Sequence, residues 1–192
     1  MAGSLIFDLE SSHKFTDYIA IPAQRGVKVE VNLVGDGASD FDFEVLSGAK
    51  QTVLKQNGNT SNERGSFTPS MSREYMIAVS NFTGRRSRYK LQMRWERPVT
   101  GSMAVSRILR GGVADNYQFE YKAGQKATLE LRGNYGTNLD ITVIDPNGKK
   151  VAETTDISDQ EYLIWDVKDS GRYTVNVINR GLKASFYSLR AN

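Results

Sequence analysis

The sequence predicts an all-β protein made of two tandem β-sandwich units of the jelly-roll or immunoglobulin-like type. Apolar and polar residues alternate in short runs, as in residues 173–177, which is the pattern of a half-buried strand. The same pattern occurs 98 positions earlier, in residues 75–79. Polar turns separate these runs and no helical period interrupts them, which is typical of a β-sandwich.

The repeat extends along most of the chain. The matched positions are mainly glycines and residues of the kind that fill cores, and duplication of one fold explains such matches. Two copies form a tandem rather than a solenoid, which needs at least three repeats. We expect a first unit at residues 5–96, a linker at 97–102 and a second unit at 103–192, because Pro98 and Gly101 break strand pairing. Examples of matched pairs are Gly26 with Gly124, Leu33 with Leu131, Val45 with Val143, and Tyr89 with Tyr187.

Each unit has several predicted strands whose apolar positions alternate. In the first unit the runs are 27–33, 41–45, 75–79 and 89–95. In the second unit they are 127–131, 139–143 and 173–177. Residues 145–148, Asp-Pro-Asn-Gly, form a turn signal because proline presets φ and glycine accepts the left-handed region.

Composition excludes several classes of site. The 192 residues include 25 basic and 22 acidic ones, and this net charge of +3 is spread too evenly to indicate a nucleic-acid partner. No cysteine is present, which excludes disulfides, a thiolate nucleophile and a cysteine metal site. No apolar run approaches the roughly 20 residues of a membrane helix.

The sequence also lacks a recognisable catalytic constellation. His13 is the sole histidine and lies in a polar stretch, so a Ser-His-Asp arrangement has no credible base. No phosphate-binding loop or dinucleotide fingerprint occurs. We therefore expect a protein that is not an enzyme.

Four motifs in the second unit occur in an order that resembles a known family. They are residues 121–125, 139–148, 170–177 and 187–189. In this order they resemble the bacterial pre-peptidase C-terminal domain, a small β-sandwich appended to secreted proteases and other exported proteins, over about residues 105–191. The first unit keeps Asp42, Tyr75 and Tyr89 but lacks the Asp-Pro-Asn-Gly turn, so it resembles a diverged copy.

The resemblance implies a non-catalytic accessory module, exported from a bacterium, that recognises a polysaccharide or another protein. Residues 1–4, Met-Ala-Gly-Ser, are typical of a cloning remnant, so we expect that a native signal peptide was removed. The expected location is therefore periplasmic or secreted. The oligomeric state is left open.

A second resemblance concerns one loop. The second unit is also similar to periplasmic inhibitors of invertebrate-type and goose-type lysozymes, which place a Ser-Gly-x-Tyr loop in the lysozyme cleft. This implies a binding loop formed by Ser170, Gly171, Arg172 and Tyr173. The alternative is a structural turn in which glycine supplies an unusual φ and the tyrosine packs inward.

Calcium is the one ion that the sequence suggests. Asp140, Asp145 and Asn147 flank the predicted turn of the second unit, and Ca²⁺ prefers oxygen ligands of this kind. Collagen-binding members of the pre-peptidase family bind calcium, so the resemblance implies the same ion. The alternative is that such acidic residues lie on a solvated sheet face. No other cofactor is expected.

The most basic stretch lies in the last strand of the first unit. Arg86, Arg88, Lys90 and Arg94 share one face of this strand. Such a face suits an anionic glycan or a lipid headgroup. The alternative is an outward face whose positive charges discourage edge-to-edge pairing.

Overall fold

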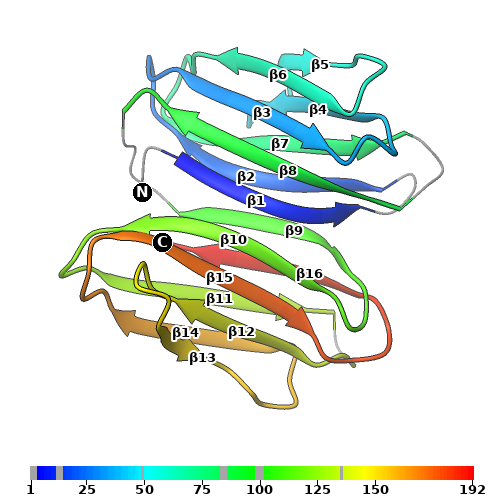
Figure 1. Cartoon of the computed structure of the whole chain (residues 1–192). Coiled ribbons are helices and arrows are strands. Elements are labelled where there is room, and N and C mark those ends of the chain that lie inside the picture. Colours follow the sequence, from blue (N-terminus) through cyan, green and yellow to red (C-terminus); the bar gives the residue numbers. More distant parts are fainter. Residues whose placement is uncertain (1–3, 12–14, 49, 83–85, 98–101, 135) are drawn as a thin grey trace.

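The computed structural model describes residues 4–11, 15–48, 50–82, 86–97, 102–134 and 136–192. Predictions that fall on Met1, His13, Pro98 and Gly101 lie outside these ranges. The described residues form sixteen strands and no helix, arranged as two antiparallel sheets packed face to face (Figure 1). The predicted all-β sandwich is confirmed.

The first half of the chain contains β1 (Ser4–Ser11), β2 (Thr16–Ala23), β3 (Val29–Gly35), β4 (Phe41–Leu46), β5 (Thr52–Gln56), β6 (Asn62–Phe67), β7 (Arg73–Asn81) and β8 (Ser87–Trp95). The second half contains β9 (Met103–Leu109), β10 (Ala114–Tyr121), β11 (Lys126–Gly133), β12 (Leu139–Ile144), β13 (Lys150–Glu153), β14 (Gln160–Asp166), β15 (Gly171–Asn179) and β16 (Ser185–Ala191). The unit boundaries stay a prediction.

The core consists of the inward-facing residues of both sheets. In β8 the residues Tyr89, Leu91, Met93 and Trp95 are buried, and the residues between them face solvent. The other long strands follow the same period, as the sequence predicts. Buried side chains from both halves of the chain form one continuous cluster, so the two halves share a single core.

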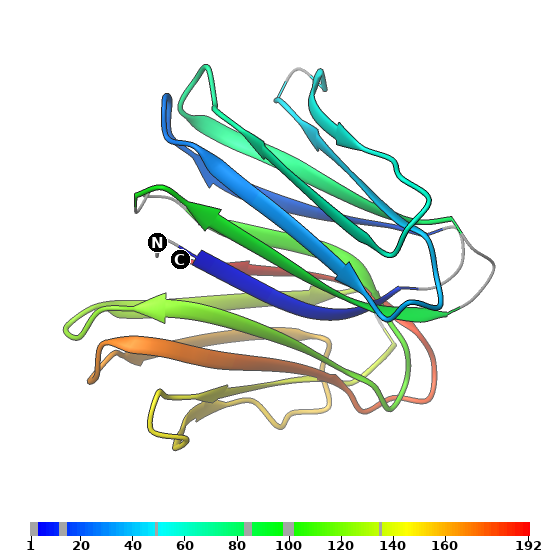
Figure 2. The ribbon, with the colours of Figure 1, turned by 45° about the horizontal axis from the view of Figure 1, so that its top comes forward.

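Both sheets continue from one half of the molecule into the other. Sheet A has the order β13-β12-β15-β10-β1-β8-β3-β6, and sheet B has the order β14-β11-β16-β9-β2-β7-β4-β5. The halves meet where β1 pairs with β10 and where β2 pairs with β9 (Figures 1 and 2). The sequence predicted the tandem but not these shared sheets.

The two junctions are related by a pseudo-two-fold axis. Phe7 of β1 lies opposite Tyr117 of β10, and Val105 of β9 lies opposite Ile19 of β2. Phe7 and Val105 occupy the same position in the repeat, as do Tyr117 and Ile19, so the pairing is reciprocal and in the same register. Strands that lie in sheet A in the first half therefore lie in sheet B in the second half.

A buried ionic network lies at this junction. The side chain of Arg107 is fully buried, with its Nε 2.8 Å from Asp115 Oδ2 and its Nη1 3.4 Å from Asp17 Oδ2. The Tyr89 hydroxyl donates to Asp17 at 2.7 Å, and the Tyr187 hydroxyl donates to Asp115 at 2.6 Å. The aspartates are repeat partners and so are the tyrosines, whereas one arginine serves both copies.

Burial controls the protonation of these carboxyl groups. Loss of solvent raises the pKa of Asp115 to about 6 and raises the pKa of Asp17, although Arg107 and the tyrosine hydroxyls act in the opposite direction. Burial raises the pKa of Tyr89 and Tyr187 well above the ordinary value, and the negative charge of the bonded carboxylate, Asp17 for Tyr89 and Asp115 for Tyr187, raises it further. The network therefore holds one cation for two carboxylates in a buried site.

Replacing Arg107 by leucine, the residue that the first unit has at the equivalent position 9, is expected to destabilise the protein by about 3–5 kcal/mol, because two buried carboxylates lose their cation. Urea unfolding measures the loss. The triple variant Asp17→Asn, Arg107→Leu, Asp115→Asn is expected to recover a large part of it, since it leaves no buried charge. The exposed Arg172→Leu is the control, and an equal loss there would contradict this role.

Stability is expected to fall as the pH rises from 4 to 7. A carboxyl group with a raised pKa in the folded state contributes stability that is complete below the unfolded pKa and is lost as the pH passes the folded value. For Asp115 the loss is on the order of 2–3 kcal/mol. Asp115→Asn should flatten a plot of melting temperature against pH. The partly exposed Asp42, whose pKa is also raised to about 6, is tested in parallel as Asp42→Asn. An unchanged pH profile in Asp115→Asn would refute the assignment.

Candidate functional site

The exposed aromatic side chains of the strands gather on the outer face of sheet B. Tyr18 of β2, Tyr162 of β14 and Phe186 of β16 are 47%, 63% and 48% exposed. Each stands beside residues that are buried in the sandwich, so each faces outward. Within the described ranges, the strands of sheet A expose no aromatic side chain and two large aliphatic ones, Val34 and Val151. The other described tyrosines are buried.

A hollow of about 390 Å³ lies on this face, in the second half of the molecule. Small side chains on β9 and β16 form its floor, and longer charged side chains on β11 and β16 rise beside them. Its lining comprises Ala104, Ser106, Glu130, Arg132, Ser188, Leu189 and Arg190. A second hollow continues across β11 to β14 and is lined by Glu130, Leu131, Arg132, Gln160, Glu161 and Tyr162.

The two hollows share Glu130 and Arg132 and form one trough, with Tyr162 in the lining at one end and Tyr18 on the strand that borders the other end. Tyr18 lies opposite Ser106 on the neighbouring strand, and Tyr162 lies opposite Glu130. Four strand spacings separate β2 from β14, so the trough is about 19 Å long. We call it the sheet B trough and define it by Tyr18, Ser106, Glu130, Arg132, Tyr162, Ser188 and Arg190.

The trough offers hydrogen-bonding groups between two apolar rings. Glu130 pairs with Arg132, whereas Arg190 has no ion pair among the described residues. Ser106 and Ser188 add hydroxyl groups that can both donate and accept. The carboxyl groups of Asp40 and Asp42 lie outside this trough. Burial raises the pKa of Asp42, and repulsion from Asp40 raises it further. The arrangement therefore suits binding of an extended polar molecule.

The structure places Ser170 in the turn between β14 and β15, and the other three residues of the predicted binding loop, 171–173, begin β15. Tyr173 is 1% exposed and its hydroxyl donates to the Asp169 carbonyl at 3.0 Å. Ser170 accepts a hydrogen bond from the Ala123 N–H at 2.9 Å. Ser170 and Arg172 remain exposed, with Arg172 3.5 Å from Glu120. This is the geometry of a structural turn, and the role of the loop in recognition stays a prediction.

This loop packs against the Asp-Pro-Asn-Gly turn. Gly171 has φ +148°, and a Cβ atom at this position would lie 2.8 Å from Pro146 Cγ. The Asn147 side-chain amide donates to Asp169 at 3.2 Å. The two motifs that the sequence shows separately are therefore parts of one local structure.

The first unit has the same contact between turn and strand, but the glycine is in the turn and the larger residue is in the strand. Gly48 stands where the second unit has Pro146, and Arg73 stands where it has Gly171. A Cβ atom on Gly48 would lie 3.4 Å from the Arg73 guanidinium. That guanidinium also lies 5.8 Å from the centre of the Tyr75 ring, the repeat partner of Tyr173. Both units fill the same space, one with proline and the other with arginine.

The predicted calcium residues do not converge. Asp140 and Asp145 lie at opposite ends of β12, which separates their Cα atoms by about 17 Å. Arg180 pairs with Asp140 at 2.9 Å, and Asp145 accepts backbone N–H bonds from Asn147 and Lys149. Among the described residues, no three carboxylate or histidine side chains are grouped so as to hold a metal ion. Calcium binding stays a prediction.

The predicted basic face begins at Arg86, just before β8, and continues along β8 in the interior of sheet A. Arg86 pairs with Glu10, and Arg88 pairs with Asp8 at 3.3 Å. Lys90 and Arg94 are exposed and have no ion pair among the described residues. The alternative interpretation, protection of a sheet edge, is wrong, because β8 is hydrogen-bonded to β1 on one side and to β3 on the other.

Comparison with known families concerns the second half of the chain. Residues 113–179 match the bacterial pre-peptidase C-terminal domain. This match confirms the resemblance that the motif order indicates. The matched segment includes β10 to β15, the turn at residues 145–148 and the loop at residues 170–173. No curated protein sequence matches the chain.

Solved structures are similar over most of the chain but only distantly. The crystal structure of tripeptidyl peptidase 2 has a TM-score of 0.33 and 12% identity, and the alignment covers 95% of this chain and 22% of that one. The PBSX exported protein XepA has a TM-score of 0.36 and 11% identity, with 96% and 84% covered. The CBM22-1–CBM22-2 tandem domain of Paenibacillus barcinonensis Xyn10C has a TM-score of 0.29 and 7% identity, with 90% and 82% covered. Similarities at this level identify neither a ligand nor an activity.

Gly171→Ala is expected to cost about 1–3 kcal/mol, because alanine disfavours this φ and its Cβ meets Pro146. Chemical denaturation of Gly171→Ala, Pro146→Gly and the double variant measures the effect. Since the glycine at position 146 removes the contact, the double variant should lose less than the two single losses added. Strict additivity would contradict the packing of loop against turn.

Proposed function

We propose that this protein is a non-catalytic exported module that binds an extended polysaccharide in the sheet B trough. The observation that carries this proposal is the position of two exposed tyrosines: Tyr162 lines one end of a trough with polar lining groups, and Tyr18 borders the other end, opposite Ser106. The match to the pre-peptidase C-terminal domain supports an exported accessory role.

The chemistry of the trough fits sugar rings. A pyranose has an apolar C–H face and a rim of hydroxyl groups. Tyrosine offers a rigid apolar face with a polar tip, and such side chains supply contact area at low entropic cost. Ser106, Ser188 and Arg190 can reach hydroxyl groups from the floor and wall. A length of about 19 Å exceeds one sugar ring, so the expected ligand is an oligosaccharide segment.

The trough is open rather than enclosed, which fits a polymer that enters and leaves along the face. Its two carboxyl groups do not form a pair: Glu130 is on the outer face and pairs with Arg132, whereas Glu161 is buried opposite Leu131 on the inner face. We therefore assign binding rather than hydrolysis to it. No helix in the described part of the chain is long and apolar enough to cross a membrane.

Removal of both rings by Tyr18→Ala with Tyr162→Ala is expected to weaken polysaccharide binding at least tenfold, because truncating an aromatic contact costs about 1–2 kcal/mol or more. Affinity electrophoresis in gels that contain neutral glucans, xylan or mannan measures the change. Val34→Ala with Val151→Ala removes two exposed apolar side chains from sheet A and serves as the control.

Two results would contradict this function. The wild-type protein would migrate unretarded in every neutral polysaccharide, or the tyrosine variant would be retarded as strongly as the wild type. Both tyrosines are exposed, so the variants should keep the wild-type melting temperature. A loss of binding is then a loss of contact rather than of fold.

A further inference from the structure

The pseudo-two-fold axis implies a counterpart of the trough on the opposite face of the molecule. The outer faces of β9, β16, β11 and β14 in sheet B correspond to those of β1, β8, β3 and β6 in sheet A. In this counterpart, Asn32 stands for Glu130, Gln92 for Arg190 and Arg64 for Tyr162. The fold is repeated at this position, but the chemistry differs.

A hollow of about 270 Å³ lies at this counterpart, lined by Glu30, Asn32, Arg64, Gln92 and Arg94. Strand pairing fixes its layout. Asn32 lies between Arg64 on β6 and Gln92 on β8, and Arg94 lies opposite Glu30. We call this site the sheet A hollow.

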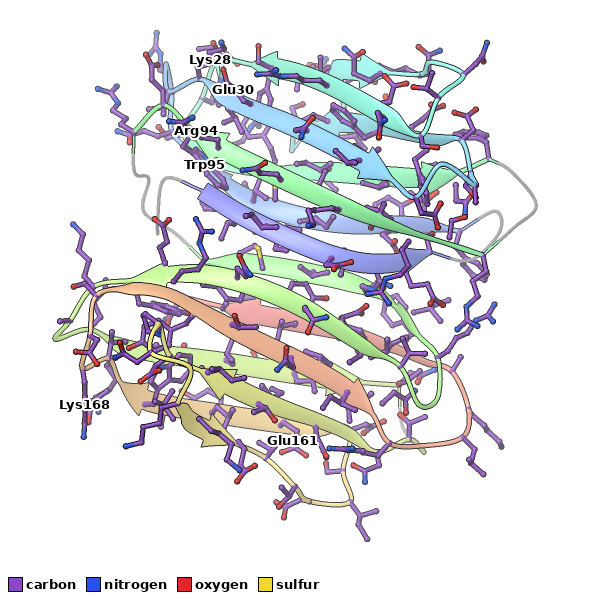
Figure 3. The ribbon with its side chains drawn as sticks, viewed as in Figure 1. Lys28, Glu30, Arg94, Trp95, Glu161 and Lys168 are labelled. Atoms are coloured by element: carbon purple, nitrogen blue, oxygen red, sulfur yellow. The ribbon has the colours of Figure 1, made fainter. Side chains whose placement is uncertain are left out.

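The cations of the sheet A hollow are not neutralised by its single carboxylate. Glu30 forms an ion pair with Lys28, with 3.2 Å between Oε1 and Nζ. Arg64 and Arg94 have no ion pair within the described ranges, and neither has Lys90 in the next row of the face. Figure 3 shows Lys28, Glu30 and Arg94 together near one end of the sheet. The face therefore keeps an excess of positive charge.

The two arginines can act on one ligand. Their Cα atoms lie on strands two spacings apart and in adjacent rows, a separation of about 12 Å. Guanidinium groups on extended side chains can converge across this distance. The amides of Asn32 and Gln92, which are half-buried between them, add N–H donors.

We propose that the sheet A hollow binds the anionic group, carboxylate or sulfate, of an acidic polysaccharide. The planar guanidinium fork matches both groups, and charge-assisted hydrogen bonds are the strong ones. A membrane surface is disfavoured, because this part of sheet A exposes one large apolar side chain, Val34, and has no aromatic ring to insert among the described residues. The site is separate from the sheet B trough and lies on the opposite face.

The test compares retention on polygalacturonate, which carries carboxylates, with retention on heparin, which carries sulfates. Arg64→Gln with Arg94→Gln is expected to weaken binding at least tenfold and to reduce its dependence on salt. Lys126→Gln with Lys168→Gln removes the same charge from exposed sites in the second half and should bind as the wild type does. The polymer that is retained identifies the anionic group.

Three outcomes would overturn the proposal: no retention on either polymer, equal losses in the two double variants, or binding confined to vesicles of phosphatidylserine and phosphatidylcholine. The variant Tyr18→Ala with Tyr162→Ala should keep its retention on the acidic polymer. This last measurement separates the two sites, so that failure of one proposal does not decide the other. Circular dichroism and thermal melting confirm that each variant is folded.

Discussion

A single buried guanidinium holds two carboxylates at the centre of this molecule, at the place where its two halves are joined. Arg107 projects from β9 toward Asp17 of β2 and Asp115 of β10, the strands on which the halves meet. The paired backbones of β1 with β10 and of β2 with β9 remove the open edges that each half would otherwise present. The shared sheets in turn place the two candidate sites on opposite outer faces.

Much of the fold could be predicted because strand period and repeat are local signals. Tyr173, Val175 and Val177 alternate with polar residues, and all three are buried. The shared sheets could not be predicted, since edge pairing uses backbone groups that leave no side-chain signature. One signal of the junction was present: Arg107 occupies the repeat position of Leu9, a residue at which a core side chain is expected.

The candidate sites were less accessible to prediction. Tyr18 and Tyr162 are far apart in sequence. They border the same trough because β2 and β14 lie in the same sheet, four strand spacings apart, and the sequence does not reveal this strand order. The sequence identified the basic stretch at β8, but Arg86 and Arg88, at its amino-terminal end, are paired with acidic residues of β1. Arg64, which completes the sheet A hollow, comes from β6 and has no basic neighbour on that strand.

The difference between Leu9 and Arg107 also sets which halves can associate. Across the same junction, two first halves would bring together two copies of Asp17 with leucine in place of the cation, and two buried carboxylates would remain uncompensated. Two second halves would place two copies of Arg107 in a space that holds one. Only a first half and a second half match in charge and volume, so the residues at positions 9 and 107 determine which halves can pair. A cleaved chain would therefore reassemble as a heterodimer rather than as two homodimers.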